Sequence, residues 1–251
     1  MNAKIDKWLH KKEGAAQIMG SLFFMQFNFF YDQYIEELNL IRLFQEEDPL
    51  GIDNRANQIG FLLDLALDIQ QKPLVEWREK FQKEVSSRYH LNRKKIESDI
   101  ISCQSYWRET NYIQPIEDVL IKKIPNYYIL LSQYNLGVSD WYGTSIVVPS
   151  LFVINHNMKR HTYVVLFEVL LSQLFMKIRL MHPDLMNWDI WLISELGTFT
   201  ILHNIFDEFL NVEKTGYREV DELIPKADYL YKNTKNIDEF IENIILFKRK
   251  K

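Results

Sequence analysis

Hydrophobic residues recur about every three to four positions over most of the chain, and this spacing predicts a mainly helical protein. Polar clusters and prolines interrupt the periodicity, and each interruption marks the expected start or end of a helix. The helices predicted in this way are residues 1–47 (one helix or two), 54–70, 73–85, 92–110, 115–124, 159–181, 188–210, 218–232 with a kink or break at Pro225, and 240–247 behind a capping-box pattern formed by Asn236 and Glu239.

Two short segments are instead rich in β-branched and aromatic residues, and we expect them to be strands. They cover residues 126–134 and 144–154, and a predicted loop, 137–143, separates them. Pro149 interrupts the second segment, which is typical of an edge strand or a bulge, because proline lacks the amide donor that a central strand needs.

The order of these segments predicts the fold class and the organisation of the chain. We expect an α+β fold that is mainly helical, with a small mixed sheet of about three to five strands before a pair of central helices. The change of pattern divides the chain into a helical N-terminal region, 1–124, and a region of sheet and helices, 125–251. One continuous domain is the alternative to this division.

Two carboxylates interrupt the most apolar of the predicted helices. Glu168 lies within Val164–Phe175, and Glu195 lies within Trp191–Phe199. A charged group in so apolar a run must be paired, must face a cleft, or must be neutralised, because burial of an isolated charge is costly. Two such carboxylates on successive helices therefore indicate a functional site or the remains of one.

This arrangement resembles the gluzincin-type zinc metallopeptidases, in which one helix carries His-Glu-x-x-His and a later helix supplies a glutamate as the third ligand. When Glu168 is aligned with the general base of that motif, Phe167 and Leu171 stand at the positions of the two histidines. Glu195 stands at the position of the third ligand, in a similar Trp-Leu-x-x-Glu context. The resemblance covers about residues 125–247, and it implies a zincin-like fold that has lost both imidazole ligands.

The resemblance leads to a first hypothesis, a catalytically inactive metallopeptidase-like protein that binds a protein or a peptide and holds no cofactor. The binding groove would lie between an edge strand and the central helix, with Glu168 as its single carboxylate. The residues expected to line it are Trp141, Tyr142, Ser145, Val147, Phe167 and Leu171. Two alternatives stay open: a hydrolase that uses Glu168 and Glu195 with or without a metal, and a helical interaction or immunity-type protein.

Without a metal, Glu168 has two expected environments. It either bonds to a nearby side chain, for which Tyr163, Arg179 and His203 are candidates, or lies beside Glu195 so that one of the two carboxyls keeps a proton. Burial and a neighbouring negative charge both favour the protonated form of a carboxyl group.

Composition and charge narrow the expected partners and location. The net charge of −4 provides no general attraction to nucleic acid or to an anionic membrane, so neither is expected as a partner. The single cysteine, Cys103, excludes an intrachain disulfide and fits the reducing cytoplasm. The apolar stretch of residues 15–31 is shorter than the roughly 20 residues that span a bilayer, so we expect a buried helix there.

Overall fold

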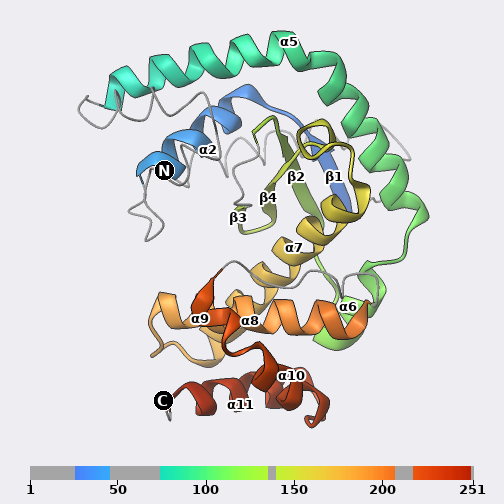
Figure 1. Ribbon diagram of the computed structural model, residues 1–251, viewed down its shortest axis with the longest axis vertical. Coiled ribbons are helices and arrows are strands. Elements are labelled where there is room, and N and C mark those ends of the chain that lie inside the picture. The colour runs from blue at the N-terminus through green and yellow to red at the C-terminus, as the bar shows by residue number, and fades with distance from the viewer. Residues whose placement is uncertain (1–25, 46–73, 135–139, 207–216, 250–251) are drawn as a thin grey trace.

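A small sheet stands at the centre of the described part of the chain, with long helices packed around it and further helices layered at one end (Figure 1). The computed structural model describes residues 26–45, 74–134, 140–206 and 217–249. Within these ranges there are eight α-helices, one short 3-10 helix and four strands. The prediction of a mainly helical α+β fold with a small sheet is therefore confirmed.

The four strands are β1 (Phe27–Phe30), β2 (Tyr127–Ser132), β3 (Asp140–Tyr142) and β4 (Ser145–Pro149). The α-helices are α2 (Gln33–Gln45), α5 (Leu74–Glu109), α6 (Ile113–Leu120), α7 (Met158–Met181), α8 (Asn187–Ile205), α9 (Arg218–Asp221), α10 (Ile224–Lys232) and α11 (Ile237–Arg249), and a 3-10 helix, η1 (Leu151–Ile154), precedes α7.

The sheet has the order β1-β2-β4-β3. Strands β1, β2 and β4 are parallel, and β3 runs antiparallel to β4 at one edge. The register pairs Phe27 with Tyr127 and Ile129 with Ile146. Because β3 and β4 are separated only by the turn at Gly143, which has a positive φ of 62°, the antiparallel pair forms a tight hairpin.

The two faces of the sheet meet different helices. On one face, the Tyr127 hydroxyl lies 2.6 Å from Ser172 Oγ of α7 and accepts a hydrogen bond of 2.6 Å from Gln173 Nε2. On the other face, Ser132 Oγ donates to Glu36 Oε1 of α2 over 2.7 Å. The alternation of side chains along a strand thus sends β2 residues in turn toward α7 and toward α2.

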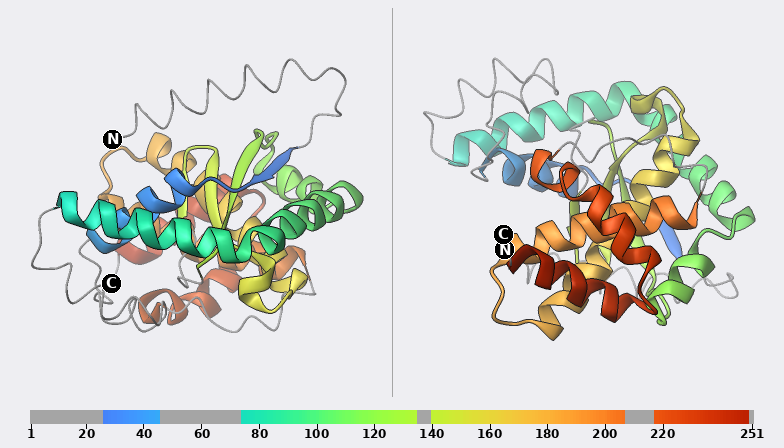
Figure 2. Two further views of the ribbon diagram at one scale, coloured as in Figure 1. Left: turned by 90° about the horizontal axis from the view of Figure 1, so that it is seen from above. Right: turned by 60° about the horizontal axis from the view of Figure 1, so that its bottom comes forward.

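The helices form layers that are visible from three directions. Helix α5 curves around the sheet, while α7 passes beneath the sheet and packs on α8 (Figure 1). Helices α10 and α11 lie on the far side of α8, and the rotated views show the same succession (Figure 2). Side chains from β1, α5, the sheet, α7, α8 and α11 belong to one continuous hydrophobic core.

The first strand corrects the prediction that residues 1–47 are helical. Phe27 and Phe29 alternate with less buried neighbours and pack on Trp107 of α5, with ring centroids 4.8 and 6.4 Å away. The helical spacing of hydrophobic residues does not decide the structure here, because parallel pairing with β2 determines the conformation of this short apolar run. The helix expected nearby begins only at Gln33, and residues 1–25 lie outside the described ranges.

Helix α5 corrects a second prediction, since it joins the two helices expected at 73–85 and 92–110 into one of 36 residues. The polar stretch between them continues the helix instead of ending it. Ion pairs one turn apart support this stretch: Arg88 with Glu84 at 3.2 Å and Arg93 with Glu97 at 2.8 Å. The helix expected at 54–70 lies outside the described ranges.

The helices after the sheet lie close to their predicted positions. Helix α7 begins one residue before the expected 159–181, and Asn157 caps it by accepting a hydrogen bond of 3.0 Å from the Arg160 amide. The expected break lies just before Pro225: α9 ends at Asp221, α10 begins at Ile224, and Pro225 stands in the first turn of α10. The Asn236 side chain caps α11 by accepting from the Glu239 amide over 2.9 Å, as the capping-box pattern predicts.

A polar network joins the start of β1 to α6. The buried Glu117 carboxylate accepts hydrogen bonds from Gln26 Nε2 at 3.1 Å, from the Ile124 amide at 2.9 Å and from Lys123 Nζ. Burial alone would raise the Glu117 pKa, but these donors outweigh it and hold that pKa below its usual value. Among the described helices, none is both long enough and apolar enough to pass through a bilayer.

Candidate functional site

Helices α7 and α8 hold the two carboxylates that the sequence singles out. Both helices are apolar on most of their circumference because both lie inside the molecule, and Leu192 to Leu202 of α8 is buried without interruption. The two helices pack tightly at Gly197, where an added Cβ would lie 3.2 Å from Leu174 Cδ1. A small residue at this point lets the two backbones approach and brings their polar groups within reach of one another.

Glu168 on α7 and Glu195 on α8 are almost completely buried, with 4% and 5% of their surface exposed. The pKa of Glu195 is raised from 4.5 to about 8. Burial is the main cause, and the negative charge of Glu168 also contributes. The two carboxyl groups therefore interact through a medium of low polarity, and Glu195 keeps its proton at neutral pH. This is one of the two environments expected from the sequence for a site without a metal.

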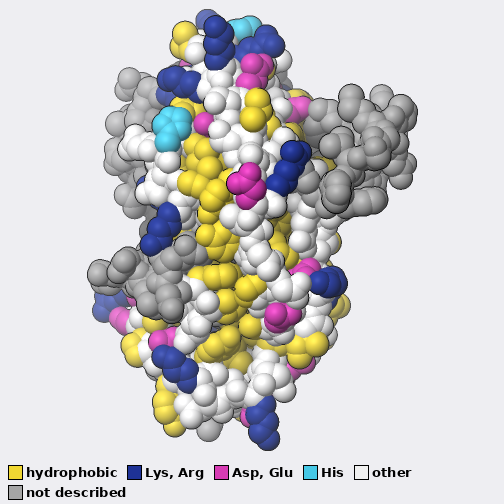
Figure 3. Space-filling model, turned by 90° about the vertical axis from the view of Figure 1, so that its right-hand side faces the viewer, with side chains coloured by type: hydrophobic (Ala, Val, Ile, Leu, Met, Phe, Trp, Pro, Cys, Tyr) yellow, Lys and Arg dark blue, Asp and Glu magenta, His cyan; other side chains and the backbone are white. Residues whose placement is uncertain are grey.

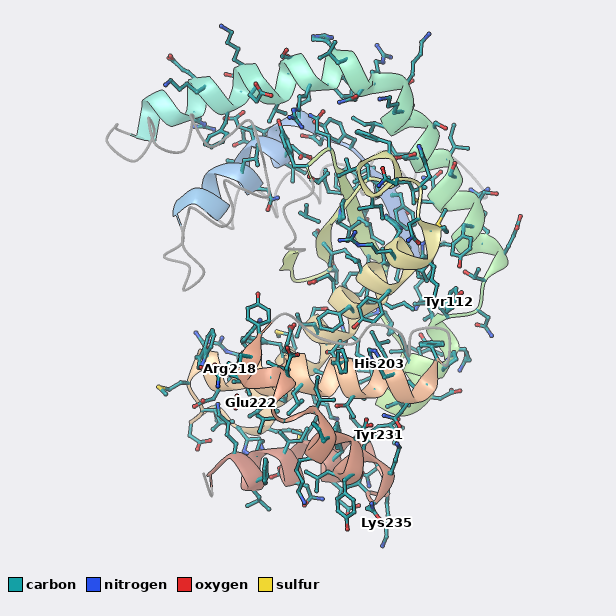
Figure 4. All side chains as sticks on the ribbon, in the orientation of Figure 1. Tyr112, His203, Arg218, Glu222, Tyr231 and Lys235 are labelled. Carbon is teal, nitrogen blue, oxygen red and sulfur yellow. The ribbon has the colours of Figure 1, made fainter. Side chains whose placement is uncertain are left out.

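A third acid, Asp221, reaches the pair from α9. Its charge also contributes to the raised pKa of Glu195. Arg218, the first residue of this short helix, forms an ion pair of 2.9 Å with Glu222 directly after its end, and Figure 4 shows both residues near α8. Sequence reasoning missed Asp221, because an acid in a short, polar helix carries no signal of its own until α9 is placed against α8.

Tyr163 and His203 lie on the same side of the helix pair. Burial raises the pKa of the Tyr163 hydroxyl, and the nearby charge of Glu195 adds to the shift. The Tyr163 ring lies 6.0 Å from the His203 ring in an edge-on arrangement. His203 Nδ1 donates to the Phe199 carbonyl over 2.8 Å, and Figure 4 shows this histidine on α8. Tyr163, a candidate partner from the sequence, is thus close to Glu195.

The positions of the two missing histidines are filled by apolar packing. Leu171 is 4% exposed, and Phe167 is half-buried with its ring 5.6 Å from that of Tyr163. No group of three or more His, Cys, Asp or Glu side chains in the described ranges is placed to hold a metal ion. Glu168, Glu195 and Asp221 supply carboxylate oxygens, but Phe167 and Leu171 offer no nitrogen donor beside them.

The histidine at the start of α7 belongs to a different environment. His161 is fully buried, and both of its ring nitrogens lie 4.0 Å from Cys103 Sγ of α5. Burial lowers the pKa of His161 to about 4 and raises that of Cys103 to about 12. The imidazole and the thiol are therefore both neutral core groups.

The residues predicted to line a peptide groove do not share one face of the sheet. Ile146 and Val148 of β4 belong to the core that contains α7, so Ser145 and Val147 lie on the opposite face. Phe167, Glu168 and Leu171 are on α7, which contacts both β3 and β4. Trp141 and Tyr142 form most of the short edge strand β3, and their side chains lie outside what the structure describes.

A second buried carboxyl, which sequence reasoning missed, lies on the other face of the sheet. Glu36 of α2 is fully buried, and burial raises its pKa to about 8 despite the hydrogen bond from Ser132. The Gln133 side chain beside it donates to the Tyr31 hydroxyl over 2.7 Å. The predicted helix through residue 31 concealed this cluster, because its members meet only when β1 and β2 pair.

Comparison of the chain with protein-family models, with curated proteins and with solved structures found no match.

Proposed function

We propose that this protein is a catalytically inactive metallopeptidase-like protein that binds a protein or a peptide. The observation that carries the proposal is the interaction of Glu168 with Glu195 across the α7–α8 contact. In the gluzincin-type peptidases that the sequence resembles, the equivalent glutamates meet at one zinc ion. Here the neighbouring positions carry Phe167 and Leu171, so the carboxylates meet without imidazole ligands.

The order of elements supports the same proposal. A small sheet precedes α7, and its edge strand β3 contacts that helix; this order supports the proposal of a zincin-like fold. The chain neutralises the buried pair with a proton on Glu195 instead of a divalent cation. A protein with this arrangement keeps the shape of a peptidase site while lacking the group that activates water.

Strand β3 is the element that we assign to binding. It is an edge of the described sheet, and an extended peptide can add to such an edge through main-chain hydrogen bonds. The pairing of β3 with β4 is antiparallel, so one row of β3 backbone groups points away from β4. The bound segment would lie along the side of α7 that carries Phe167 and Leu171.

A specific observation keeps a carboxylate hydrolase as the second candidate. A carboxyl group whose pKa is raised toward neutral, with a second carboxyl group nearby, is a usual arrangement for acid–base catalysis. Glu195, with a pKa of about 8, would donate a proton, and Glu168 is the nearby carboxyl group that would accept one. Burial of both groups counts against this role, since a substrate would have to displace the side chains that cover them.

The first test restores the missing ligands. The double variant Phe167→His, Leu171→His should bind about one zinc ion per chain, because His, His and Glu195 then form a three-ligand site. The wild-type protein should hold no zinc after dialysis, and the added change Glu195→Gln should abolish binding by the double variant. Zinc content is measured by elemental analysis of dialysed protein, and circular dichroism confirms the fold of each variant.

A matched control places two histidines at the same spacing on the exposed face of α5, as Ser98→His, Ser102→His. This pair should bind zinc weakly and without dependence on Glu195. If a folded Phe167→His, Leu171→His variant binds no more zinc than the control, the zincin-like geometry is wrong. One dialysis-resistant zinc in the wild-type chain, lost in Glu168→Gln, would contradict the inactive assignment.

The second test locates the binding strand. Peptides selected from a random displayed library are added to the protein, and amide hydrogen exchange is followed by mass spectrometry. We expect slower exchange at residues 140–142 and no change at 27–30, the opposite edge of the sheet. Protection only at 27–30 would exclude β3. Cleavage of the peptide, lost in Glu168→Gln and Glu195→Gln, would instead establish the hydrolase.

A further inference from the structure

A polar pocket opens beside α6, at the end of the sheet where β1 and β2 begin. Its volume is about 340 Å³, which lies at the small end of the range for ligand sites. Segments far apart in the sequence line it: the residue before β1, the start of α6, and the connection from α6 to β2. Two isoleucines and six polar residues line what we call the amide pocket, and the polar ones are Gln26, Asn111, Gln114, Glu117, Lys123 and Asn126.

The floor of the amide pocket is a fixed carboxylate. Glu117 is only 7% exposed, and its carboxylate accepts hydrogen bonds from Gln26, from Lys123 and from the Ile124 amide. Gln26 Nε2 also donates to the Ile124 carbonyl over 2.9 Å, so it joins the start of β1 to the segment that leads into β2. These bonds hold the pocket in one shape before a ligand arrives, which reduces the entropy cost of binding.

The pocket offers a ligand both donors and acceptors. Asn111 and Asn126 are exposed, and each carboxamide presents two N–H donors and one carbonyl acceptor. Gln26 uses both of its amide hydrogens within the protein, so its carbonyl oxygen remains as an acceptor. Lys123 Nζ has three hydrogens and directs two of them to side-chain oxygens of the protein, which leaves the third for a ligand.

The charges of the pocket favour a neutral ligand. Burial would raise the Glu117 pKa, but its hydrogen-bond donors outweigh burial and keep the carboxylate ionised at neutral pH. A charged ligand would be attracted by one member of the Glu117–Lys123 pair and repelled by the other, so nothing would compensate the loss of its hydration. Figure 3 views the side of the molecule that carries α6, and acidic and basic side chains are interspersed over it.

The remaining chemistry of the pocket fits hydroxyl groups. Among the described residues that line it, none is aromatic, so a nucleobase would find no ring on which to stack. A hydroxyl group both donates and accepts a hydrogen bond, and it therefore matches both halves of a carboxamide. Ile113 and Ile124 add a small apolar surface, against which the C–H groups of a sugar ring can pack.

We propose that the amide pocket binds a neutral hexose, either free or as the terminal unit of an oligosaccharide. The sugar hydroxyls bond to the two asparagine carboxamides and to Lys123 Nζ, and one of them donates to Gln26 Oε1. These bonds replace hydrogen bonds to water in an open pocket, so the dissociation constant should be about millimolar. The pocket lies at the β1 side of the sheet, opposite the edge strand β3, so the proposal does not depend on peptide binding.

The test titrates isotopically labelled, full-length protein with glucose, galactose and mannose and follows the side-chain amide signals by NMR. At least one of these sugars should give saturable shifts of the Asn111 and Asn126 signals. Asn111→Ala and Asn126→Ala should each weaken binding of that sugar about fivefold, because each variant loses hydrogen bonds to it. The methyl glycoside distinguishes the two sources: equal binding indicates a terminal unit, and loss of binding indicates the free sugar.

Matched controls separate the pocket from general surface effects. Gln82→Ala removes an exposed carboxamide of α5 outside the pocket and should leave sugar binding unchanged. The 6-phosphate and the 2-amino derivative of the bound sugar should bind more weakly than the neutral sugar, because the Glu117–Lys123 pair gives a charged group no net attraction. Circular dichroism checks that each variant keeps its fold, as the exposure of both asparagines leads us to expect.

Three outcomes would overturn the proposal. The first is that every sugar gives no shift, or shifts that rise linearly without saturation and so indicate adventitious contact only. The second is an equal loss of binding in Gln82→Ala and Asn126→Ala. The third is tighter binding of the 6-phosphate than of the neutral sugar, which would assign the pocket to an anion.

Discussion

A single residue, Glu195, shows how this chain stores an acid inside a hydrophobic core. Its carboxyl group lies on a helix that is buried on almost every side, and the charges of Glu168 and Asp221 surround it. Burial and these charges act in the same direction, so Glu195 stays protonated at pH values well above the usual pKa of a glutamate. The folded state therefore binds a proton that the unfolded chain releases.

Because the folded state binds this extra proton, the protein should become less stable as the pH rises. The pKa of Glu195 is 4.5 in the unfolded chain and about 8 in the fold, so the free energy of unfolding should fall as pH rises between those values. The slope for one such group is about 1.4 kcal/mol per pH unit. Glu195→Gln cannot ionise, so it should match the wild type near pH 5 and be more stable by about 2–4 kcal/mol at pH 8.

Urea unfolding at several pH values checks this expectation, and Glu117→Gln is its control with the opposite sign. Hydrogen bonds outweigh burial and lower the Glu117 pKa, so its stabilisation is present above the unfolded pKa and is lost in acid. Glu117→Gln should therefore be destabilised at neutral pH and less so in acid. A Glu195→Gln variant that is less stable than wild type at pH 8 would show that Glu195 is ionised in the fold.

At the scale of elements, hydrophobic periodicity predicted the long helices, but it failed for short segments whose conformation depends on pairing with another strand. Helices α7 and α8 each begin within one residue of the predicted position, because their apolar runs are long and are bounded by capping or proline signals. Strands β2 and β4 were placed by their β-branched and aromatic composition. The remainder of the second predicted strand is η1, which begins directly after Pro149 and Ser150.

The errors have specific physical causes. Strand β1 contains only four residues, too few for a period of two to be told from a helical one, and its conformation depends on β2. Strand β3 lay within a predicted loop because three residues around a tight turn carry no strand signal. The carboxylates Glu168 and Glu195 were found because a charge in an apolar run is conspicuous, whereas Asp221 and Glu36 became visible only through tertiary contacts.

At the scale of the whole molecule, the described residues share one core. Phe27 and Trp107 from the region before residue 124 belong to the same buried cluster as Val169 and Ile241 from the region after it. The Tyr127 hydroxyl joins the sheet to α7, and Trp107 covers the same face of the sheet from α5. A boundary near residue 124 would therefore cut through packed side chains.

We expect that residues 125–251 do not fold alone. A fragment of this range loses β1 and α5, so one side of β2 and part of the sheet face become exposed to water. The fragment should lack a cooperative unfolding transition, whereas the full chain should show one. Addition of a second fragment, 1–124, should restore the transition by association. A sharp transition in residues 125–251 alone would instead establish two domains.

The pairing of β1 with β2 also affects how the chain folds during its synthesis. Strand β1 cannot pair until β2 has been synthesised, and Tyr127, the partner of Phe27, is made 100 residues later (127 minus 27). At roughly 5–20 residues per second, translation of that interval takes about 5–20 s, during which the phenylalanines of β1 have left the exit tunnel unpaired. The nascent chain thus carries an unpaired aromatic segment while 100 of its 251 residues are made, and a chaperone that binds such segments would protect it during that interval.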